Sequence, residues 1–451
     1  MLYKFFEILL KIAVRIYFRN KYVSGKENIP SGRPVMFVAN HPGAFMDPIV
    51  IGTYANRSLY YIARGESFKN KLAAWFFRRI HMIPVYRKEE TPELTHKNTD
   101  VFKACFEHFE RGRSLMIFPE GSSKIEYRLR KVKSGAARIA LGAENQNNFG
   151  LGLMIVPVGL TYSNPKNFRT DVHVSFGKPL NLKEYQKEYE KDNFSTAKQL
   201  TKDIENAIKA QMLFIENNEN DEVFDQLQSL YFEEMIKRFE EPNLSKEEKL
   251  SLKNELVKAV DYFKSFSPDL SKKLQQLLNE YFEQINEIER KFPDFNKRLI
   301  GGKTSLTKHV LKLIFGFPLF LFGLISNYLP YRFSGFLAEK TSQRDDFTGG
   351  LRLVIGTFTF LFYFIGLTIL INIYFPFVYA FVLVFIMPFF GMIALGYTRA
   401  YSAFKAELFY QKMIVTENYS FKKMLELRLH IINELEEARL LYNQVLQSER
   451  K

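Results

Sequence analysis

Two kinds of hydrophobic pattern divide the chain at about residue 180. Before this point, short apolar runs with turn residues near their ends occur at residues 35–39, 59–63, 82–86, 114–118, 155–160 and 172–176. Stretches with helical spacing separate several of these runs, at residues 68–79, 99–110 and 134–141. This alternation predicts an α/β domain with a largely parallel sheet over residues 21–180.

Residues 1–20 have a different pattern. Charged side chains recur every three or four positions up to Arg19, and most of the other positions are Phe, Leu or Ile. One helical face is therefore polar and the rest is apolar. The stretch has no small-residue cleavage site, so it is not typical of a signal peptide. We expect a basic amphipathic helix lying on an anionic membrane; the alternative is an ordinary helix packed on the domain.

Residues 181–300 are rich in Glu and Lys and have helical spacing. They predict a helical spacer with a charged, solvated face and carry no recognisable chemical motif. Residues 398–451 are expected to form a charged helical tail, with apolar side chains on one stripe at Leu425, Leu429, Ile432 and Leu435. This tail could pack on the spacer or on a second copy of the chain, and the sequence does not decide between them.

A long apolar segment precedes this tail. Residues 353–397 are almost uncharged and are interrupted by Asn372 and Pro376, which predicts two transmembrane helices joined by a tight turn. Basic residues flank the outer ends and none lies in the turn, so both ends are expected in the cytoplasm. Within residues 301–352, a shorter apolar stretch at 313–329 is broken by glycine and proline. We expect a re-entrant or interfacial hairpin there; the alternative is a true span.

Composition narrows the choice of partners. The formal net charge is +14, and residues 1–180 hold the whole excess, with 28 Lys+Arg against 14 Asp+Glu. The positive electrostatic potential of this excess could attract nucleic acid, anionic lipid or a phosphorylated small substrate. The single cysteine, Cys105, excludes an internal disulfide and a cysteine-cluster metal site, and its position predicts the buried face of a helix. The seven histidines form no pair at helical spacing, so no metal is expected.

The first of two chemical motifs pairs a histidine with a carboxylate just after an apolar strand. His41 can act as a general base if Asp47 orients its ring. Six residues turn a helix by roughly 240°, so the two side chains cannot share one helical face. Pro42 and Gly43 predict a turn that brings Asp47 back towards His41. In the alternative interpretation, Asp47 only caps a helix.

The second motif is Phe118-Pro119-Glu120-Gly121, at the end of another predicted strand. A carboxylate beside a glycine at this place is suited to bind a hydroxylated or phosphorylated substrate, because the glycine lets the backbone come close. The alternative is a purely structural turn. Together, the two motifs favour transfer of a group onto an alcohol.

With these motifs the chain resembles the phospholipid/glycerol acyltransferase family, which includes glycerol-3-phosphate and lysophosphatidate acyltransferases. The family's His and Asp are usually separated by four residues; here five intervene, a variant that resembles the fungal-type glycerol-3-phosphate/dihydroxyacetone-phosphate acyltransferases. The second family block corresponds to residues 81–87 and implies that Arg87 meets the substrate phosphate. The fourth, an apolar strand with a central proline, fits residues 155–159.

The third family block matches Phe118 to Gly121, but the following Thr-Arg of the family is replaced by Ser122-Ser123. One expected phosphate-binding arginine is therefore absent. The candidates to replace it are the nearby basic residues Lys124, Arg128, Arg130 and Lys133.

The resemblance implies a membrane-bound O-acyltransferase of phospholipid synthesis with its catalytic domain on the cytoplasmic face. It would move an acyl chain from acyl-CoA or acyl carrier protein to glycerol-3-phosphate or lysophosphatidate, without another cofactor. His41 would be the catalytic base and Asp47 its orienting group. The acceptor-binding residues would be Arg87, Phe118, Pro119, Glu120, Gly121, Ser122 and Lys133.

Two alternatives remain open at this point. The acceptor could be another lysophospholipid or membrane alcohol, or the chain could be a non-catalytic lipid-binding or tethering protein on this fold. A nucleic-acid partner is not expected, because the chain has predicted membrane helices and no recognisable nucleic-acid motif.

Overall fold

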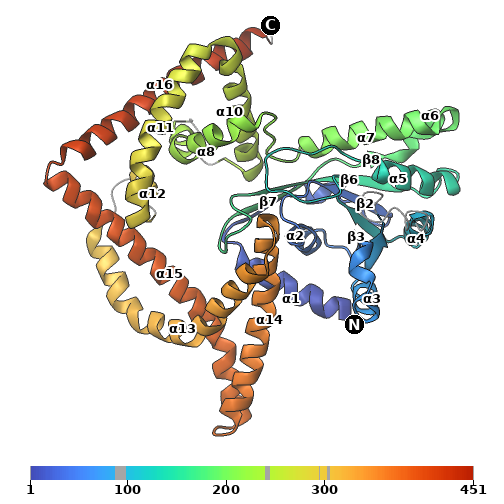
Figure 1. Ribbon diagram of the computed structural model, residues 1–451, viewed down its shortest axis with the longest axis horizontal. Helices are drawn as coiled ribbons and strands as arrows, with labels where there is room; N and C mark the ends of the chain where they lie inside the picture. Colours follow the sequence, from blue (N-terminus) through green and yellow to red (C-terminus); the bar gives the residue numbers. More distant parts are fainter. Residues whose placement is uncertain (1, 87–97, 239–243, 294, 302–304, 450–451) are drawn as a thin grey trace. The chain divides into compact units, whose positions relative to one another are not determined.

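The computed structural model describes residues 2–86, 98–238, 244–293, 295–301 and 305–449 (Figure 1). It divides into two compact units, each built from two stretches of chain. The α/β unit consists of Met1–Phe214 and Phe333–Phe360. The helical unit consists of Ile215–Arg332 and Leu361–Lys451.

One eight-stranded sheet forms the centre of the α/β unit, in the order β1-β7-β6-β2-β5-β3-β4, with β8 pairing with β6. All pairs are parallel except β6 with β7 and β6 with β8. The predicted α/β fold with a largely parallel sheet is confirmed. The strands are β1 (Lys21–Ser24), β2 (Val35–Ala39), β3 (Leu59–Arg64), β4 (Met82–Val85), β5 (Ser114–Ile117), β6 (Met154–Tyr162), β7 (Val172–Phe176) and β8 (Leu180–Asn181).

Helices cover both faces of this sheet, as the alternation along β2 shows. Met36 and Val38 belong to a core shared with helices α4 (Asn98–Glu110), α5 (Gly135–Gln146) and α7 (Asn193–Lys209). Val35, Phe37 and Ala39 belong to the opposite core, shared with α1 (Leu2–Tyr17) and α2 (Met46–Tyr54). Successive side chains of a strand point to opposite faces, so a strand covered on both sides is apolar throughout. Cys105 is buried in the first core, as its position predicted.

The sheet unit extends beyond the predicted boundary at residue 180. Helix α6 (Gln186–Lys191) and α7 follow, and Leu200, Ile204 and Ile208 of α7 are buried in the core of the sheet. The predicted spacer therefore begins too early. Helical periodicity looks the same whether a helix covers its own sheet or starts a separate layer, so the pattern alone could not place this boundary.

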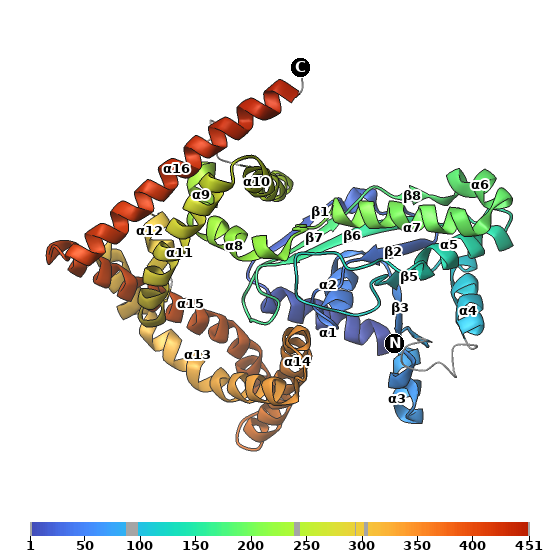
Figure 2. The ribbon, with the colours of Figure 1, turned by 45° about the horizontal axis from the view of Figure 1, so that its top comes forward.

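The helical unit has its own core. Its helices other than the candidate membrane spans are α8 (Asp221–Leu230), α9 (Phe232–Lys237), α10 (Lys246–Phe266), α11 (Pro268–Lys291), α12 (Phe295–Gly301) and α16 (Tyr419–Glu449), shown in Figure 2. Ile431 and Ile432 of α16 are buried with Leu278 and Tyr281 of α11. The tail therefore packs on the spacer helices of the same chain, which the sequence had left open.

In the part of the chain that the structure describes, three helices are long and apolar enough to cross a membrane: α13 (Leu306–Thr341), α14 (Asp345–Asn372) and α15 (Phe377–Val415). The turn between α14 and α15 lies where the sequence predicted it. The break in the helix expected within residues 301–352 does not occur, because α13 is one continuous helix. The re-entrant path of this segment stays a prediction. Two residues of this stretch contact α15: Gly323 lies against the Phe390 carbonyl, and Asn327 donates to the Met387 carbonyl at 3.0 Å.

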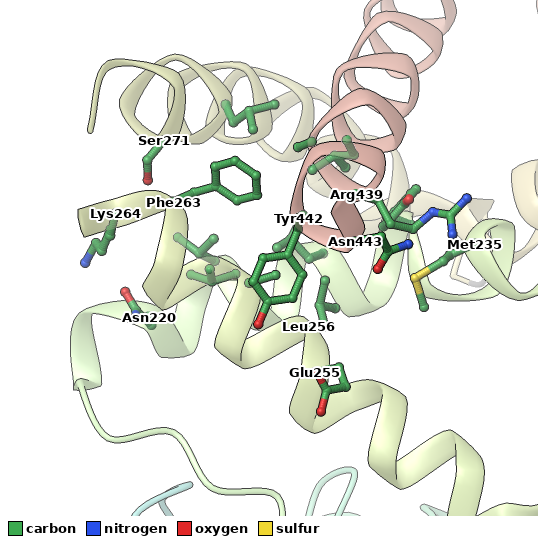
Figure 3. A pocket seen from close by; sticks show the side chains of 18 of the residues that line it. Asn220, Met235, Glu255, Leu256, Phe263, Lys264, Ser271, Arg439, Tyr442 and Asn443 are labelled. Atoms are coloured by element: carbon green, nitrogen blue, oxygen red, sulfur yellow. The ribbon is translucent and has the colours of Figure 1, made fainter. Parts of the chain in front are cut away.

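A mostly apolar cavity of about 430 Å³ lies among α8, α10, α11 and α16 (Figure 3). Leu256, Phe263, Leu274 and Tyr442 are among its lining residues. All of the lining residues belong to the helical unit, so the cavity is separate from the predicted chemistry of the α/β unit.

Candidate active site

The turn between β2 and α2 brings His41 and Asp47 together. His41 follows the end of β2, and Asp47 lies in the first turn of α2. His41 Nδ1 lies 2.7 Å from Asp47 Oδ2. The turn predicted from Pro42 and Gly43 therefore does form this pair. Gly43 is needed sterically, because a Cβ on it would lie 2.8 Å from Asp47 Oδ1.

Asp47 is a fully buried carboxylate held by three groups. Besides His41, its Oδ2 accepts the Gly43 backbone N–H at 2.8 Å, and its Oδ1 accepts the Tyr162 hydroxyl at 2.8 Å. Burial and the neighbouring carboxylate raise the pKa of Tyr162 well above its ordinary value, so this hydroxyl keeps its proton and donates. Hydrogen bonds to a charged acceptor are the stronger kind, so this set fixes Asp47 and, through it, the His41 ring.

Tyr162 was missed by the sequence analysis. It ends β6, which lies parallel to β2, so both strands bring their carboxyl ends to the same edge of the sheet. A tyrosine at the end of a strand that neighbours the His41 strand was the available signal. It depends on strand order, which a single sequence does not provide.

Hydrogen bonds join the loop that carries His41 to the strand β6 and to the turn after β5. The Asn40 side chain donates to the Leu160 carbonyl at 2.9 Å and accepts the Leu160 N–H at 2.7 Å. The His41 backbone N–H donates to Glu120 Oε1 at 2.8 Å. These bonds connect the loop after β2 with the strand β6 on one side and the turn after β5 on the other.

The Phe118–Gly121 turn lies directly beside His41. The Phe118 ring stacks on the imidazole with centroids 4.0 Å apart and planes 14° apart. Gly121 has φ +78°, a backbone conformation that residues other than glycine rarely adopt. Lys133 N–H donates to the Pro119 carbonyl at 3.0 Å, and the Lys133 ammonium lies 3.3 Å from where a Gly121 Cβ would be. Lys133 therefore reaches the turn, and its predicted role in acceptor binding stays a prediction.

Glu120 is buried and binds protein groups. Besides His41, it accepts the Arg130 backbone N–H at 3.2 Å and Arg130 Nε at 3.1 Å through Oε2. Burial raises the pKa of this carboxyl, while Arg130 and the backbone N–H groups act in the opposite direction. Glu120 thus positions the His41 loop, and an acceptor hydroxyl would have to share its oxygens.

Arg130 bonds Ser122, the residue before Ser123, which stands where the family pattern carries its own arginine. Its Nη1 donates to Ser122 Oγ at 2.7 Å, and its Nη2 donates to the Ser122 carbonyl. Of the four candidate replacements, Arg130 bonds both Glu120 and Ser122, and its Nε also lies 3.5 Å from Glu126 Oε1. Lys124 and Arg128 also pair with Glu126, at 3.2 and 3.3 Å.

The catalytic and acceptor-binding roles assigned to the site residues stay predictions. Arg87 lies outside the described residues, so its role stays a prediction. Among the residues that the structure describes, no group of three or more His, Cys, Asp or Glu side chains could hold a metal ion. The expectation of a metal-free reaction also stays a prediction.

Comparison with known proteins supports the chemistry suggested by this geometry. The chain is 27% identical over 161 residues to a chloroplastic 1-acyl-sn-glycerol-3-phosphate acyltransferase of Arabidopsis thaliana, covering 35% of this chain and 41% of that protein. It is 35% identical over 82 residues to glycerol-3-phosphate O-acyltransferase 1 of Saccharomyces cerevisiae, covering 18% and 11%. The chain thus spans less than half the length of these two relatives.

A shorter relative is covered more fully. The 1-acyl-sn-glycerol-3-phosphate acyltransferase of Bacillus subtilis is 29% identical over 140 residues, which are 31% of this chain and 65% of that protein. Among solved structures, a 1-acyl-sn-glycerophosphate acyltransferase from Thermotoga maritima aligns with a TM-score of 0.34 at 21% identity, over 46% of this chain and 76% of that chain.

The family comparison covers both motifs of the site. Residues 21–161 match the family model described as Acyltransferase. This span runs from β1 through β6 and includes His41, Asp47 and the Phe118–Gly121 turn. Residues 21–161 are therefore a domain of the Acyltransferase family, as the motifs had indicated.

Proposed function

We propose that the chain is a membrane-bound O-acyltransferase of phospholipid synthesis that acylates glycerol-3-phosphate or lysophosphatidate. The observation that carries the proposal is the 2.7 Å contact between His41 Nδ1 and Asp47 Oδ2, with Asp47 buried and held by Tyr162 and Gly43. A histidine fixed in this way is a general base for an alcohol. The relatives named above act on the same two acceptors.

The reaction follows from the hydrogen bonding of the imidazole. Nδ1 donates to Asp47, which leaves Nε2 as the proton acceptor. Nε2 removes the proton of the acceptor hydroxyl as its oxygen attacks the thioester carbonyl carbon. The C–S bond then breaks, and the imidazolium returns the proton to the leaving thiolate. The products are an ester and a free thiol, and no protein nucleophile is needed.

The acceptor phosphate would be bound by cations around the Phe118–Gly121 turn. Lys133 reaches this turn, and Arg87 is the residue that the family pattern assigns to the phosphate. The Arg130 guanidinium already donates to Glu120 and Ser122. It is therefore better placed to stabilise the turn than to bind the phosphate with all of its N–H groups. The donor would be an acyl-CoA or acyl carrier protein thioester.

The test is acyl transfer by purified protein in detergent. Labelled acyl-CoA and acyl carrier protein thioesters are offered with glycerol-3-phosphate and with lysophosphatidate. His41→Ala is expected to lower the rate by about 10²–10⁴-fold or more, because general-base catalysis contributes this much. His430→Ala is the matched control, since His430 is exposed on α16 in the helical unit. Product formation that survives His41→Ala at the normal rate contradicts the mechanism.

Absence of product from wild-type protein leads to a different conclusion. Other lysophospholipids and membrane alcohols are then offered as acceptors with the same donors. If every pairing fails while circular dichroism shows folded protein, the acyl-transfer proposal is wrong and a lipid-binding or tethering role takes its place.

We further infer that α13 is re-entrant, although it is long enough to span a membrane. In the described part of the chain, no candidate span precedes α13, so the chain reaches Leu306 without having crossed. Just after α13 ends, Arg344 Nη2 donates to the Ser123 carbonyl of the α/β unit at 2.6 Å. Both ends of α13 therefore belong on the side of the α/β domain.

Contacts within each unit support this path. In the helical unit, Gly316 lies against Tyr397 and Asn327 bonds Met387, so the first part of α13 runs antiparallel to α15. In the α/β unit, Glu339 pairs with Arg352 at 2.6 Å, so the last turns run antiparallel to α14. If α14 and α15 form a membrane hairpin, α13 enters the membrane beside α15 and leaves it beside α14. Pro318 and Pro330 inside α13 are suited to bend it.

Cysteine accessibility tests this topology. Cys105 is buried, and burial raises its pKa to about 12, so the native cysteine is expected to stay unlabelled. A membrane-impermeant maleimide should label Ser305→Cys and Gln343→Cys from the same side of sealed vesicles. It should label Tyr374→Cys, in the turn between α14 and α15, from the opposite side. Labelling of the first two variants from opposite sides contradicts the re-entrant path.

A further inference from the structure

Helix α3 (Lys71–Arg79) of the α/β unit presents an apolar face to the outside. Leu72 is 73% exposed and Trp75 is 51% exposed, and their three-residue spacing puts them on one face. Arg79 continues this face, with its guanidinium 4.6 Å from the Trp75 ring centre. Lys71 and Arg78 are also exposed, so cations flank the apolar side chains.

Neighbouring helices join α3 at an aromatic contact. Phe6 of α1 packs against Phe76 of α3 with ring centres 5.6 Å apart, and against Phe358 of α14 with ring centres 6.0 Å apart. Figures 1 and 2 both show α1 between α3 and α14. The exposed face of α3 is thus part of a group of helices that includes a candidate membrane span.

Helix α1 continues the same kind of surface. Four apolar side chains at helical spacing are exposed by 40% or more: Phe5, Ile8, Ile12 and Ile16. Lys4 and Arg15 are exposed beside them. The opposite side of α1 is buried through Val14 and Tyr17. One face of α1 therefore packs on the domain, and another is apolar and open. The contact of α1 with a membrane stays a prediction.

We propose that α3 docks on the surface of an anionic bilayer, beside α1 and the start of α14. Tryptophan favours the boundary between lipid headgroups and acyl chains, and arginine and lysine extend their charged ends to the headgroups. An exposed apolar stripe flanked by cations and held next to an apolar helix of membrane length fits this occupant. The docking concerns the membrane contact of the α/β unit and does not depend on which reaction the site performs.

The composition of the chain makes the test direct, because Trp75 is its only tryptophan. The full chain is placed in lipid nanodiscs that contain either zwitterionic lipid or a mixture with anionic lipid. Trp75 emission is expected to be blue-shifted and quenched by lipids brominated on their acyl chains, more strongly with anionic lipid. Emission at the wavelength of water-exposed tryptophan, without quenching in either lipid, overturns the proposal.

Matched variants separate docking from other effects. In Trp75→Phe/Phe194→Trp, the single tryptophan moves to α7 at a position that is 79% exposed, and its emission should stay unquenched. Lys71→Glu should lower the ratio of docked to free α3 on anionic lipid by about fivefold or more, as expected for loss of one cation near the surface. Equal quenching at positions 75 and 194, or no change in Lys71→Glu, contradicts docking through this face.

Discussion

Ser123 donates a hydrogen bond to Asp346, a residue 223 positions further along the chain, and both residues are buried. Arg344 completes the contact: it pairs with Asp346 at 2.8 Å and donates to the Ser123 carbonyl at 2.6 Å. Ser123 lies two residues after Gly121, the last residue of the turn that carries Glu120. The start of α14 is therefore hydrogen-bonded to the loop beside His41. The stretch Phe333–Phe360, far along the chain, is thus part of the α/β unit.

Ser123→Ala is expected to destabilise the α/β unit. It removes a donor from a buried carboxylate, which costs about 1–3 kcal/mol. Thermal unfolding of the detergent-solubilised protein measures the loss, and transfer activity should fall with it because the Glu120 turn loosens. Ser134→Ala is the control, since Ser134 is exposed and its side chain makes no cap bond to α5. Equal stability of both variants would show that the Ser123–Asp346 contact is unimportant.

Two glycines on α14 should respond in opposite ways to the same substitution. Gly349 lies against the Pro165 carbonyl with no room for a Cβ, whereas nothing lies within 4 Å of a Cβ on Gly366. Alanine is favoured over glycine in a helix by about 1 kcal/mol. Gly366→Ala should therefore be tolerated or stabilising. Gly349→Ala should push α14 away from the loop that contains Pro165 and lower the melting temperature. A Gly349→Ala variant as stable as Gly366→Ala contradicts the close docking of α14.

Tyr162→Phe tests the support of Asp47. The change leaves the buried Asp47 Oδ1 without its hydroxyl donor, and the carboxylate would then hold His41 less firmly. We expect a fall in kcat of about tenfold or more, because a buried acceptor left without its donor costs about 1–3 kcal/mol and about 1.4 kcal/mol corresponds to a tenfold change in rate. KM should change less than kcat, because the acceptor does not need Tyr162 for binding.

Tyr54→Phe is the matched control for this change. Tyr54 ends α2, the helix that carries Asp47, and its buried hydroxyl has no hydrogen-bond partner among the described residues. Loss of this hydroxyl should leave the activity unchanged. Similar kinetics in Tyr54→Phe and Tyr162→Phe would mean that Tyr162 does not act through Asp47.

Glu120 should make stability depend on pH in a defined direction. Burial raises the pKa of this carboxyl above its ordinary value of 4.5. Between 4.5 and the higher folded-state value, the folded protein binds more protons than the unfolded chain. The free energy of unfolding therefore falls as pH rises through this window. Glu120→Gln lacks the titration, so the difference in unfolding free energy, wild type minus variant, should fall across the window and then level off. A difference that rises with pH contradicts the assignment.

The local chemistry of the site could be predicted from the sequence because it depends on short stretches. The turn at Pro42 and Gly43 fixes where Asp47 can go, and the positive φ of Gly121 explains why the Phe118–Gly121 turn contains a glycine. Strands covered on both faces give continuous apolar runs, so the parallel sheet was also predictable. The short strand β1 was missed, because four residues give too little pattern.

The sequence by itself therefore determined the α/β class, the His41–Asp47 pair and the apolar character of residues 353–397. Only the tertiary structure decided which distant groups complete the site. Tyr162 reaches Asp47 because β6 lies beside β2, and Asp346 reaches Ser123 because the chain returns to the α/β unit after the first stretch of the helical unit. Local patterns report how a segment folds, since they arise from neighbours along the chain. Partners more than a hundred residues apart are chosen by strand order and helix packing, which no single segment encodes.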